Sequence, residues 1–241
     1  MLPILYQNHD LILYSYPLMM GLGWGVAYQV FFGLLPHDFG QVKGQFLFWS
    51  LFLVSWIGAK SLFYLTLPSH LSHDLLTQMS FWTGGGFVFY GGLLAGLIYL
   101  VIIQLCGFKL KVDHLWPILP ALTFGHAVGR LGCLLAGCCF GKETDWWWGI
   151  YQHGHDRHPT QLLEAIGLFL LGAYLLKSQK AKSLLLAQYF VFYGIIRFGV
   201  EMLRGDEIRG EWGVMTPSQW ISLGLVLLGV SLWTRLRLSR T

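Results

Sequence analysis

The stretch LWPILPALTFGHAVGRLGCLLAGCCF, Leu115–Phe140, is almost entirely apolar. It exceeds the about 20 residues that an α-helix needs to cross a hydrocarbon core of about 30 Å. Backbone polar groups inside a bilayer must be paired within their own segment, which favours a helix over an isolated strand. The stretch therefore predicts a membrane-spanning helix, and the charge of Arg130 within it requires an explanation.

Composition places the whole chain in the same class. Of its 241 residues, 55% are hydrophobic and 12% are charged, with a mean hydropathy of +0.55, whereas a soluble domain carries about 25% charge. Six further apolar segments have a suitable length: Tyr14–Leu35, Phe46–Leu67, Gly84–Cys106, Pro159–Leu176, Leu184–Leu203 and Pro217–Trp233. We predict an all-α polytopic integral membrane protein of about seven transmembrane helices, in a single domain over residues 1–241.

Charge patterning narrows the partners. The chain has no polybasic block interleaved with aromatic residues, so we predict no nucleic-acid partner. Its first residues, MLPILYQNHD, lack the basic region of a signal peptide, and the apolar character continues to the C-terminus, so we expect no cleaved signal.

The basic residues of the loops predict an orientation, because Lys and Arg concentrate on the cytoplasmic side. One side holds nine of them: Lys43, Lys109, Lys111, Lys177, Lys180, Lys182, Arg235, Arg237 and Arg240. The opposite side holds four: Lys142, Arg157, Arg204 and Arg209. We therefore predict a cytoplasmic C-terminus and an N-terminus outside.

Five charged residues fall inside the predicted helices: Lys60, Arg130, Glu164, Arg197 and Glu201. A charge in the hydrocarbon region costs about 2.5 to 3.5 kcal/mol on insertion scales, so each needs a partner or a function. The long stem of Lys60 allows its amine to snorkel, or to pair with Glu164 or with a helix end.

Arg197 and Glu201 stand one helical turn apart in YGIIRFGVEMLR. Two interpretations stay open: a structural ion pair, or an anion site in which Glu201 holds Arg197 for a phosphate. Arg130 has no acidic residue one turn away, so its partner must come from another segment or from a ligand. Its segment also carries glycines that permit close backbone approach: Gly125, Gly129, Gly132 and Gly137. We expect a lipid-binding cavity that receives an anionic phospholipid headgroup and opens to the outer side.

Six stretches, in order along the chain, resemble motifs of one known family: YSYPLMM with Tyr16, FYGGLLAG, GRLGCLLAGCCFG, HPTQLLEA, YGIIRFGVEMLR and TPSQWISLGLVLLG. The chain resembles the prolipoprotein diacylglyceryl transferases, bacterial inner-membrane enzymes with several transmembrane helices. These enzymes move the diacylglyceryl group of phosphatidylglycerol onto the lipobox cysteine thiol of a preprolipoprotein. The resemblance implies that activity, those two substrates, and neither a cofactor nor a metal.

The resemblance also implies site residues. As catalytic residues it indicates Arg130, Arg197, Glu201 and Tyr90, with the arginines stabilising the leaving phosphate. For substrate binding it adds Arg204, Tyr16, Gln161, Glu164, Cys133, Cys138 and His126.

Three positions depart from the family motifs. Tyr90 stands where the family has a histidine proposed as general base, and tyrosine, with a pKa of about 10, is a poor base at neutral pH. Cys133 and Cys138 stand where the family signature has asparagine and glutamate. Two alternatives to the family reaction follow: a diverged paralogue with another acceptor, or a non-catalytic lipid-binding protein. A transporter of anionic solutes is a third, supported only by the buried arginines.

The cysteines leave several interpretations open. Cys133 and Cys138 are about 140° apart on an unbroken helix, a poor geometry for a bridge or a shared metal, but a break at Gly137 would let them approach. Three interpretations remain open: ordinary packing of the side chains, a disulfide of Cys133 with Cys138 or Cys139, or a cysteine nucleophile that carries the lipid covalently. We expect Cys106 to be an ordinary buried cysteine.

The histidines give two weaker expectations. Three of them lie in HGHDRH, namely His153, His155 and His158, a weak metal signal without a rigid scaffold. His126 lies one turn before Arg130 and should face the same surroundings, either as a substitute base or as a neutral, hydrogen-bonded side chain.

Overall fold

The computed structural model describes residues 1–8, 12–67, 86–178, 182–205 and 213–238. The chain forms two compact units. The large unit consists of Met1–Leu34 and Leu115–Thr241, and the small unit of Leu35–His114. The sequence-based expectation of one domain stays a prediction.

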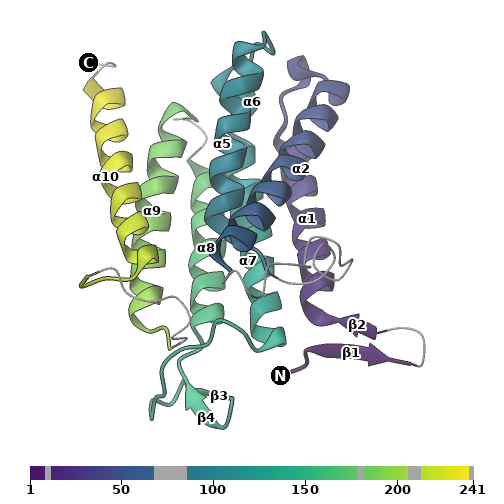
Figure 1. The fold of residues 1–241 in the computed structure, drawn as a ribbon. Helices are drawn as coiled ribbons and strands as arrows, with labels where there is room; N and C mark the ends of the chain where they lie inside the picture. The colour runs from purple at the N-terminus through teal and green to yellow at the C-terminus, as the bar shows by residue number, and fades with distance from the viewer. Residues whose placement is uncertain (9–11, 68–85, 179–181, 206–212, 239–241) are drawn as a thin grey trace. The chain divides into compact units, whose positions relative to one another are not determined.

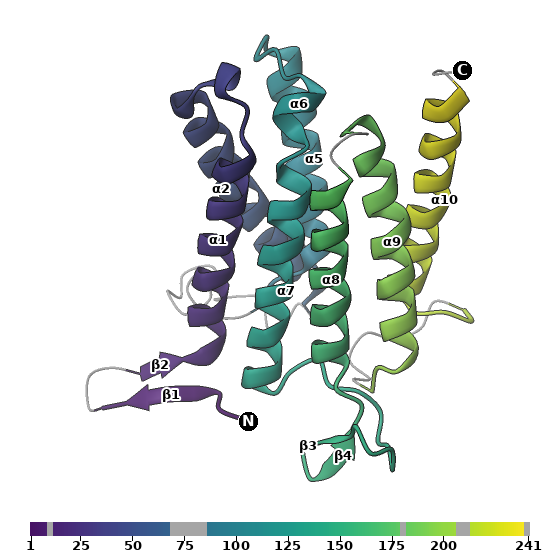
Figure 2. The same cartoon turned by 180° about the vertical axis from the view of Figure 1, so that it is seen from behind.

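The described part of the large unit contains five long helices: α1 (Ser15–Leu34), α7 (Ile118–Ala136), α8 (Thr160–Lys177), α9 (Lys182–Met202) and α10 (Pro217–Leu238). They pack side by side in the order α1, α7, α8, α9 and α10 (Figures 1 and 2). The C-terminal ends of α7 and α9 and the first turn of α8 meet at one end of this row (Figure 2). Residues from three helices can therefore build one site there.

Small residues let α1 and α7 approach closely. A Cβ added to Gly23 would lie 2.8 Å from the carbonyl oxygen of Gly125, and one added to Gly132 would lie 2.8 Å from the Cβ of Met19. Such backbone contacts are how membrane helices gain packing energy without a hydrophobic driving force. The glycines around Arg130 therefore serve the helix contact that positions it.

The small unit contains the 3-10 turn η1 (His37–Phe39) and the helices α2 (Gln41–Thr66), α5 (Phe89–Leu105) and α6 (Val112–Leu115). Lys60 of α2 is buried, and its Nζ lies 4.1 Å from the centre of the Phe87 ring, a cation–π contact that the sequence did not suggest. Cys106 follows α5 and is exposed, so the expectation of a buried cysteine is wrong.

The helices confirm the predicted all-α membrane architecture. Within the described residues, six helices are long and apolar enough to cross a membrane, and α5, with 17 residues, is a shorter apolar helix. Thr216 and Gln219 cap α10 reciprocally: the Gln219 amide donates to Thr216 Oγ1, and the Thr216 amide donates to Gln219 Oε1. The expected start of one segment at Gly84, together with Lys180, Arg209 and Arg240 of the orientation argument, lies outside the described residues.

Two short hairpins were not predicted. Strands β1 (Ile4–Gln7) and β2 (Ile12–Tyr14) pair ahead of α1, and β3 (Ile150–Gln152) and β4 (His155–Arg157) pair ahead of α8. The second hairpin turns through His153 and Gly154, both with positive φ, which matches the twist of a two-residue turn. Strands of three or four residues are too short for an alternating pattern to reveal them.

Candidate active site

Glu164 of α8 is the centre of a buried charge cluster. Its side chain is 1% exposed, and its Oε2 accepts hydrogen bonds from Arg130 Nη2 of α7 and, at 2.9 Å, from Arg197 Nη1 of α9. The structure thus supplies the partner that Arg130 lacks on its own helix. One carboxylate bridges two guanidinium groups from two different helices.

A second carboxylate holds the other side of Arg197. Arg197 Nη2 donates to Glu201 Oε2 at 2.5 Å and to Ser218 Oγ, at the start of α10, at 3.3 Å. Thr216 Oγ1 in turn donates to Glu201 Oε1 at 3.1 Å. The ion pair predicted from the spacing of Arg197 and Glu201 is confirmed, and α10 fixes it from a third direction.

Arg204 completes the cluster at the end of α9. Its side chain is buried, and its Nη1 lies 3.9 Å from Glu201 Oε2. The cluster then holds three guanidinium groups against the two carboxylates of Glu164 and Glu201, which leaves one positive charge. Among the described residues, Arg130 Nε and Glu164 Oε1 have no hydrogen-bond partner. A buried site with one net positive charge and an unused guanidinium donor is suited to an anion.

His126 and Tyr16 border the cluster. His126 Nε2 lies 3.9 Å from Glu164 Oε1, so His126 faces the same surroundings as Arg130, as its position one turn away predicts. Tyr16 of α1 packs beside Gly132, with 3.6 Å between its ring and a Cβ placed there. The Tyr16 hydroxyl is also close enough to interact electrostatically with Arg130 and with three cysteines, Cys133, Cys138 and Cys139.

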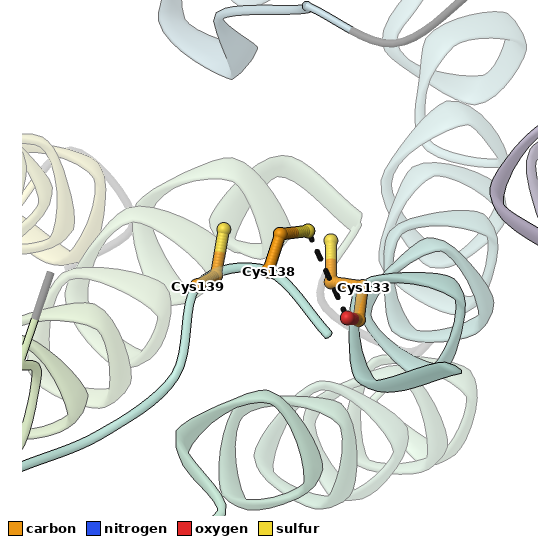
Figure 3. Close-up of side chains that lie close together, drawn as sticks. All are labelled: Cys133, Cys138 and Cys139. Atoms are coloured by element: carbon orange, nitrogen blue, oxygen red, sulfur yellow. Dashed lines mark hydrogen bonds between the residues drawn. The ribbon is translucent and has the colours of Figure 1, made fainter. Parts of the chain in front are cut away.

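Gly137 brings those cysteines together. It ends α7 in the left-handed conformation, with φ of 75°, and the Cys138 amide donates to the Cys133 carbonyl at 3.1 Å, a Schellman cap. The sulfur atoms of Cys133, Cys138 and Cys139 then lie within 4.8 Å of one another, and the Cys138 side chain turns toward Cys133 (Figure 3). All three are free thiols. The approach that the sequence made conditional on a break at Gly137 is confirmed.

Neighbouring charges act on this thiol cluster. Hydrogen bonds with Cys133 and Cys138, followed by the Arg204 and Arg130 guanidinium groups, lower the pKa of the Cys139 thiol.

The backbone of Cys139 has a positive φ of 62°. An ordinary side chain in that conformation costs about 1 to 3 kcal/mol and is found where surrounding contacts enforce it.

The first turn of α8 supplies those contacts. Thr160 Oγ1 donates to the Cys139 carbonyl at 2.8 Å, and Gln161 Nε2 donates to the Cys138 carbonyl at 2.7 Å. His153 Nε2 lies 2.7 Å from the Gly137 carbonyl. The cysteine loop is therefore tied to the same helix that carries Glu164.

Comparison with known proteins gives this arrangement a context. The family model for prolipoprotein diacylglyceryl transferase matches residues 3–235. The chain belongs to that family. A phosphatidylglycerol–prolipoprotein diacylglyceryl transferase 2 of Clostridium perfringens is 34% identical over 95% of this chain and 93% of its own length. The Finegoldia magna relative of the same enzyme name is 30% identical over 92% of this chain and 90% of its own length.

Tyr90 stands where the diacylglyceryl transferase family has a histidine. Tyr90 is the second residue of α5 and belongs to the small unit, where its ring lies 5.9 Å from that of Phe89. Its proposed catalytic role stays a prediction. The other predicted site residues lie in the large unit, around Glu164 or in the cysteine loop.

Several residues of the buried charge cluster and of the cysteine loop were not predicted from the sequence. Ser218 and Thr216 contact Arg197 and Glu201, and Thr160 fixes Cys139. Thr216 carried a signal, because T-P-x-Q is a helix-cap pattern, but a cap does not predict a bond to a buried carboxylate. A helix that ends at Gly137 brings Cys139 close to Cys133 and Cys138.

Proposed function

We propose that this chain is a phosphatidylglycerol–prolipoprotein diacylglyceryl transferase of a bacterial cell membrane. The observation that carries the proposal is the buried cluster of Arg130, Arg197 and Arg204 around two carboxylates, in a chain of this family. Phosphatidylglycerol would place its phosphate at the cluster. Its acceptor would be the lipobox cysteine of a prolipoprotein, outside the cytoplasm.

The reaction moves charge onto the phosphate. The acceptor thiolate attacks the glyceryl carbon of the lipid, a sulfur–carbon bond forms, and the carbon–oxygen bond to phosphate breaks. Glycerol phosphate leaves with one more negative charge than the phosphodiester carried. Arg130 and Arg197 would meet that charge with donors fixed in a buried site, and removing one such donor typically costs about 10²- to 10³-fold in rate.

Glu164 and Glu201 would be positioning residues in this scheme. Each holds a guanidinium group in one orientation, so that its other donors face the phosphate without reorganising during the reaction. Tyr16 and His126 would line the same cavity. Gln161 would act through the cysteine loop, since its amide is spent on the Cys138 carbonyl.

Purified protein in phosphatidylglycerol nanodiscs, incubated with a lipobox peptide, tests the proposal. We expect the peptide to gain the mass of one diacylglyceryl group while an equal amount of glycerol phosphate is released. A peptide with serine in place of the lipobox cysteine is the control and should give neither product. Retained binding of phosphatidylglycerol without any transfer would instead identify a non-catalytic lipid-binding member of the family.

A further inference from the structure

The three cysteines form a group that the phosphate chemistry does not use. Cys133 is buried in the last turn of α7, whereas Cys138 is exposed and Cys139 is half-buried. Cys138 Sγ also lies 3.7 Å from the Cys133 carbonyl oxygen (Figure 3). The group thus has a closed side toward the helix and an accessible side at Cys138.

The geometry of the three cysteines is close to that of a metal site. Three thiolates bound to one tetrahedral zinc ion at about 2.3 Å are about 3.8 Å apart. Here the sulfur atoms are all within 4.8 Å, so each pair would close by at most about 1 Å, which side-chain rotation can provide. The backbone needs no change, because Thr160, Gln161 and His153 already hold the carbonyls of the loop.

The neighbourhood connects this group to the phosphate site. The Arg130 guanidinium is within electrostatic range of Cys133 and Cys139, and that of Arg204 is within range of Cys139. A divalent ion on three thiolates carries one net negative charge, which these arginines would balance. A thiol bound at the accessible side would lie beside the groups assigned to the leaving phosphate.

We infer that Cys133, Cys138 and Cys139 bind a zinc ion whose fourth position receives the acceptor thiol. The inference rests on the proposed function. Zinc sites with three protein ligands and one open position are typical of catalysis, and four thiolates are a favoured zinc environment. A thiol that coordinates zinc is deprotonated, so the ion does the work of the general base whose family position Tyr90 occupies.

The acceptor thiol binds the ion and gives its proton to water. The zinc-bound sulfur then attacks the glyceryl carbon, the carbon–oxygen bond breaks, and its electron pair leaves with glycerol phosphate. The product is a neutral thioether, a weaker ligand than a thiolate, so it leaves the ion free for another acceptor.

Metal binding can be tested without turnover. The full chain, purified reduced in phosphatidylglycerol nanodiscs, is titrated with Co²⁺ as an optical probe and then with Zn²⁺ as a competitor. We expect a thiolate-to-cobalt charge-transfer band that saturates at one ion per chain and that zinc abolishes. Cys133→Ser and Cys139→Ser should lose the band, whereas Cys106→Ser, an exposed cysteine of the small unit, should keep it. A folded, reduced chain without the band overturns the inference.

The acceptor position has its own readout. X-ray absorption at the zinc edge should count three sulfur ligands in the loaded protein and four after addition of the lipobox peptide, with no change for the serine peptide. A count that stays at three overturns the acceptor role. If zinc gains a fourth sulfur ligand but no lipid is transferred, the proposed function is refuted, whereas the inferred zinc site is supported.

Activity separates the remaining cases. If zinc activates the acceptor, Cys133→Ser should lower transfer by about 10²-fold or more, the usual contribution of a general base, while phosphatidylglycerol binding persists. Full transfer by a variant with all three cysteines changed to serine would overturn the zinc inference and leave the proposed function intact. A disulfide among the three in protein alkylated directly in the membrane would also overturn it.

Discussion

At the level of single residues, Glu164 is decisive because its one carboxylate pairs with two arginines from neighbouring helices. Its removal would leave Arg130 buried without its carboxylate partner and Arg197 with Glu201 as its remaining carboxylate partner. Breaking a buried ion pair from one side usually costs more than the pair itself contributes, because the remaining charge stays desolvated.

Glu164→Gln should therefore destabilise the protein by about 3 to 5 kcal/mol, measured as the free energy of unfolding in detergent. Glu143→Gln is the matched control, because Glu143 pairs with Arg157 at 3.0 Å while its side chain is 56% exposed. That control should cost no more than about 1 kcal/mol. Equal losses in the two variants would contradict the central place of Glu164.

At the level of elements, α1 packs against α7, the helix that carries Arg130. The Cβ of Gly23→Ala would meet the Gly125 carbonyl oxygen at 2.8 Å. Overpacking of this kind costs about 1 to 3 kcal/mol, so we expect a lower thermal midpoint and weaker phosphatidylglycerol binding.

Gly25→Ala on the same helix is the control, since nothing lies within 4 Å of its added Cβ. It should be neutral or slightly stabilising, because alanine is the better helix former. A midpoint for Gly23→Ala as high as that of Gly25→Ala would mean that α1 and α7 do not touch as described.

The first turn of α8 should set the order of the cysteine loop. Gln161→Met removes the donor to the Cys138 carbonyl, and the loss of about 1 kcal/mol should raise amide exchange over residues 137–141 about fivefold. Hydrogen exchange with mass spectrometry measures this. Gln45→Met, whose side chain bonds Trp49 in the small unit, should leave that segment unchanged; equal exchange in both variants would refute the restraint.

Most helices and one ion pair of the site could be predicted from the sequence, but contacts between helices could not. Long apolar segments predict their helices because hydropathy acts over about 20 residues, and the pair of Arg197 and Glu201 follows from helical periodicity. The pairing of Arg130 with Glu164 joins two helices, and no spacing along the chain contains it. The cysteine cluster depends on the left-handed conformation of Gly137, which decides whether Cys138 continues the helix or turns back toward Cys133.

At the scale of the whole molecule, the chain is a multi-pass membrane protein with one surplus positive charge buried in its polar cluster. That surplus favours a lipid whose headgroup is anionic over one that carries a compensating cation. We expect the metal-free protein to bind phosphatidylglycerol at least about tenfold more tightly than phosphatidylcholine, as measured by native mass spectrometry. Arg204→Ala, which removes the surplus charge, should abolish most of that preference; an unchanged preference would refute the charge argument.

The most direct test of the account is the transfer rate of Arg130→Ala, Arg130→Lys and wild-type protein in phosphatidylglycerol nanodiscs with a lipobox peptide. We predict a loss of about 10²-fold or more for alanine, and little rescue by lysine, whose point charge cannot both bind Glu164 and present a planar set of donors to the phosphate. Arg237→Ala, an exposed arginine of α10, should transfer at the wild-type rate. Wild-type turnover in Arg130→Ala would contradict the claim that this cluster stabilises the leaving phosphate.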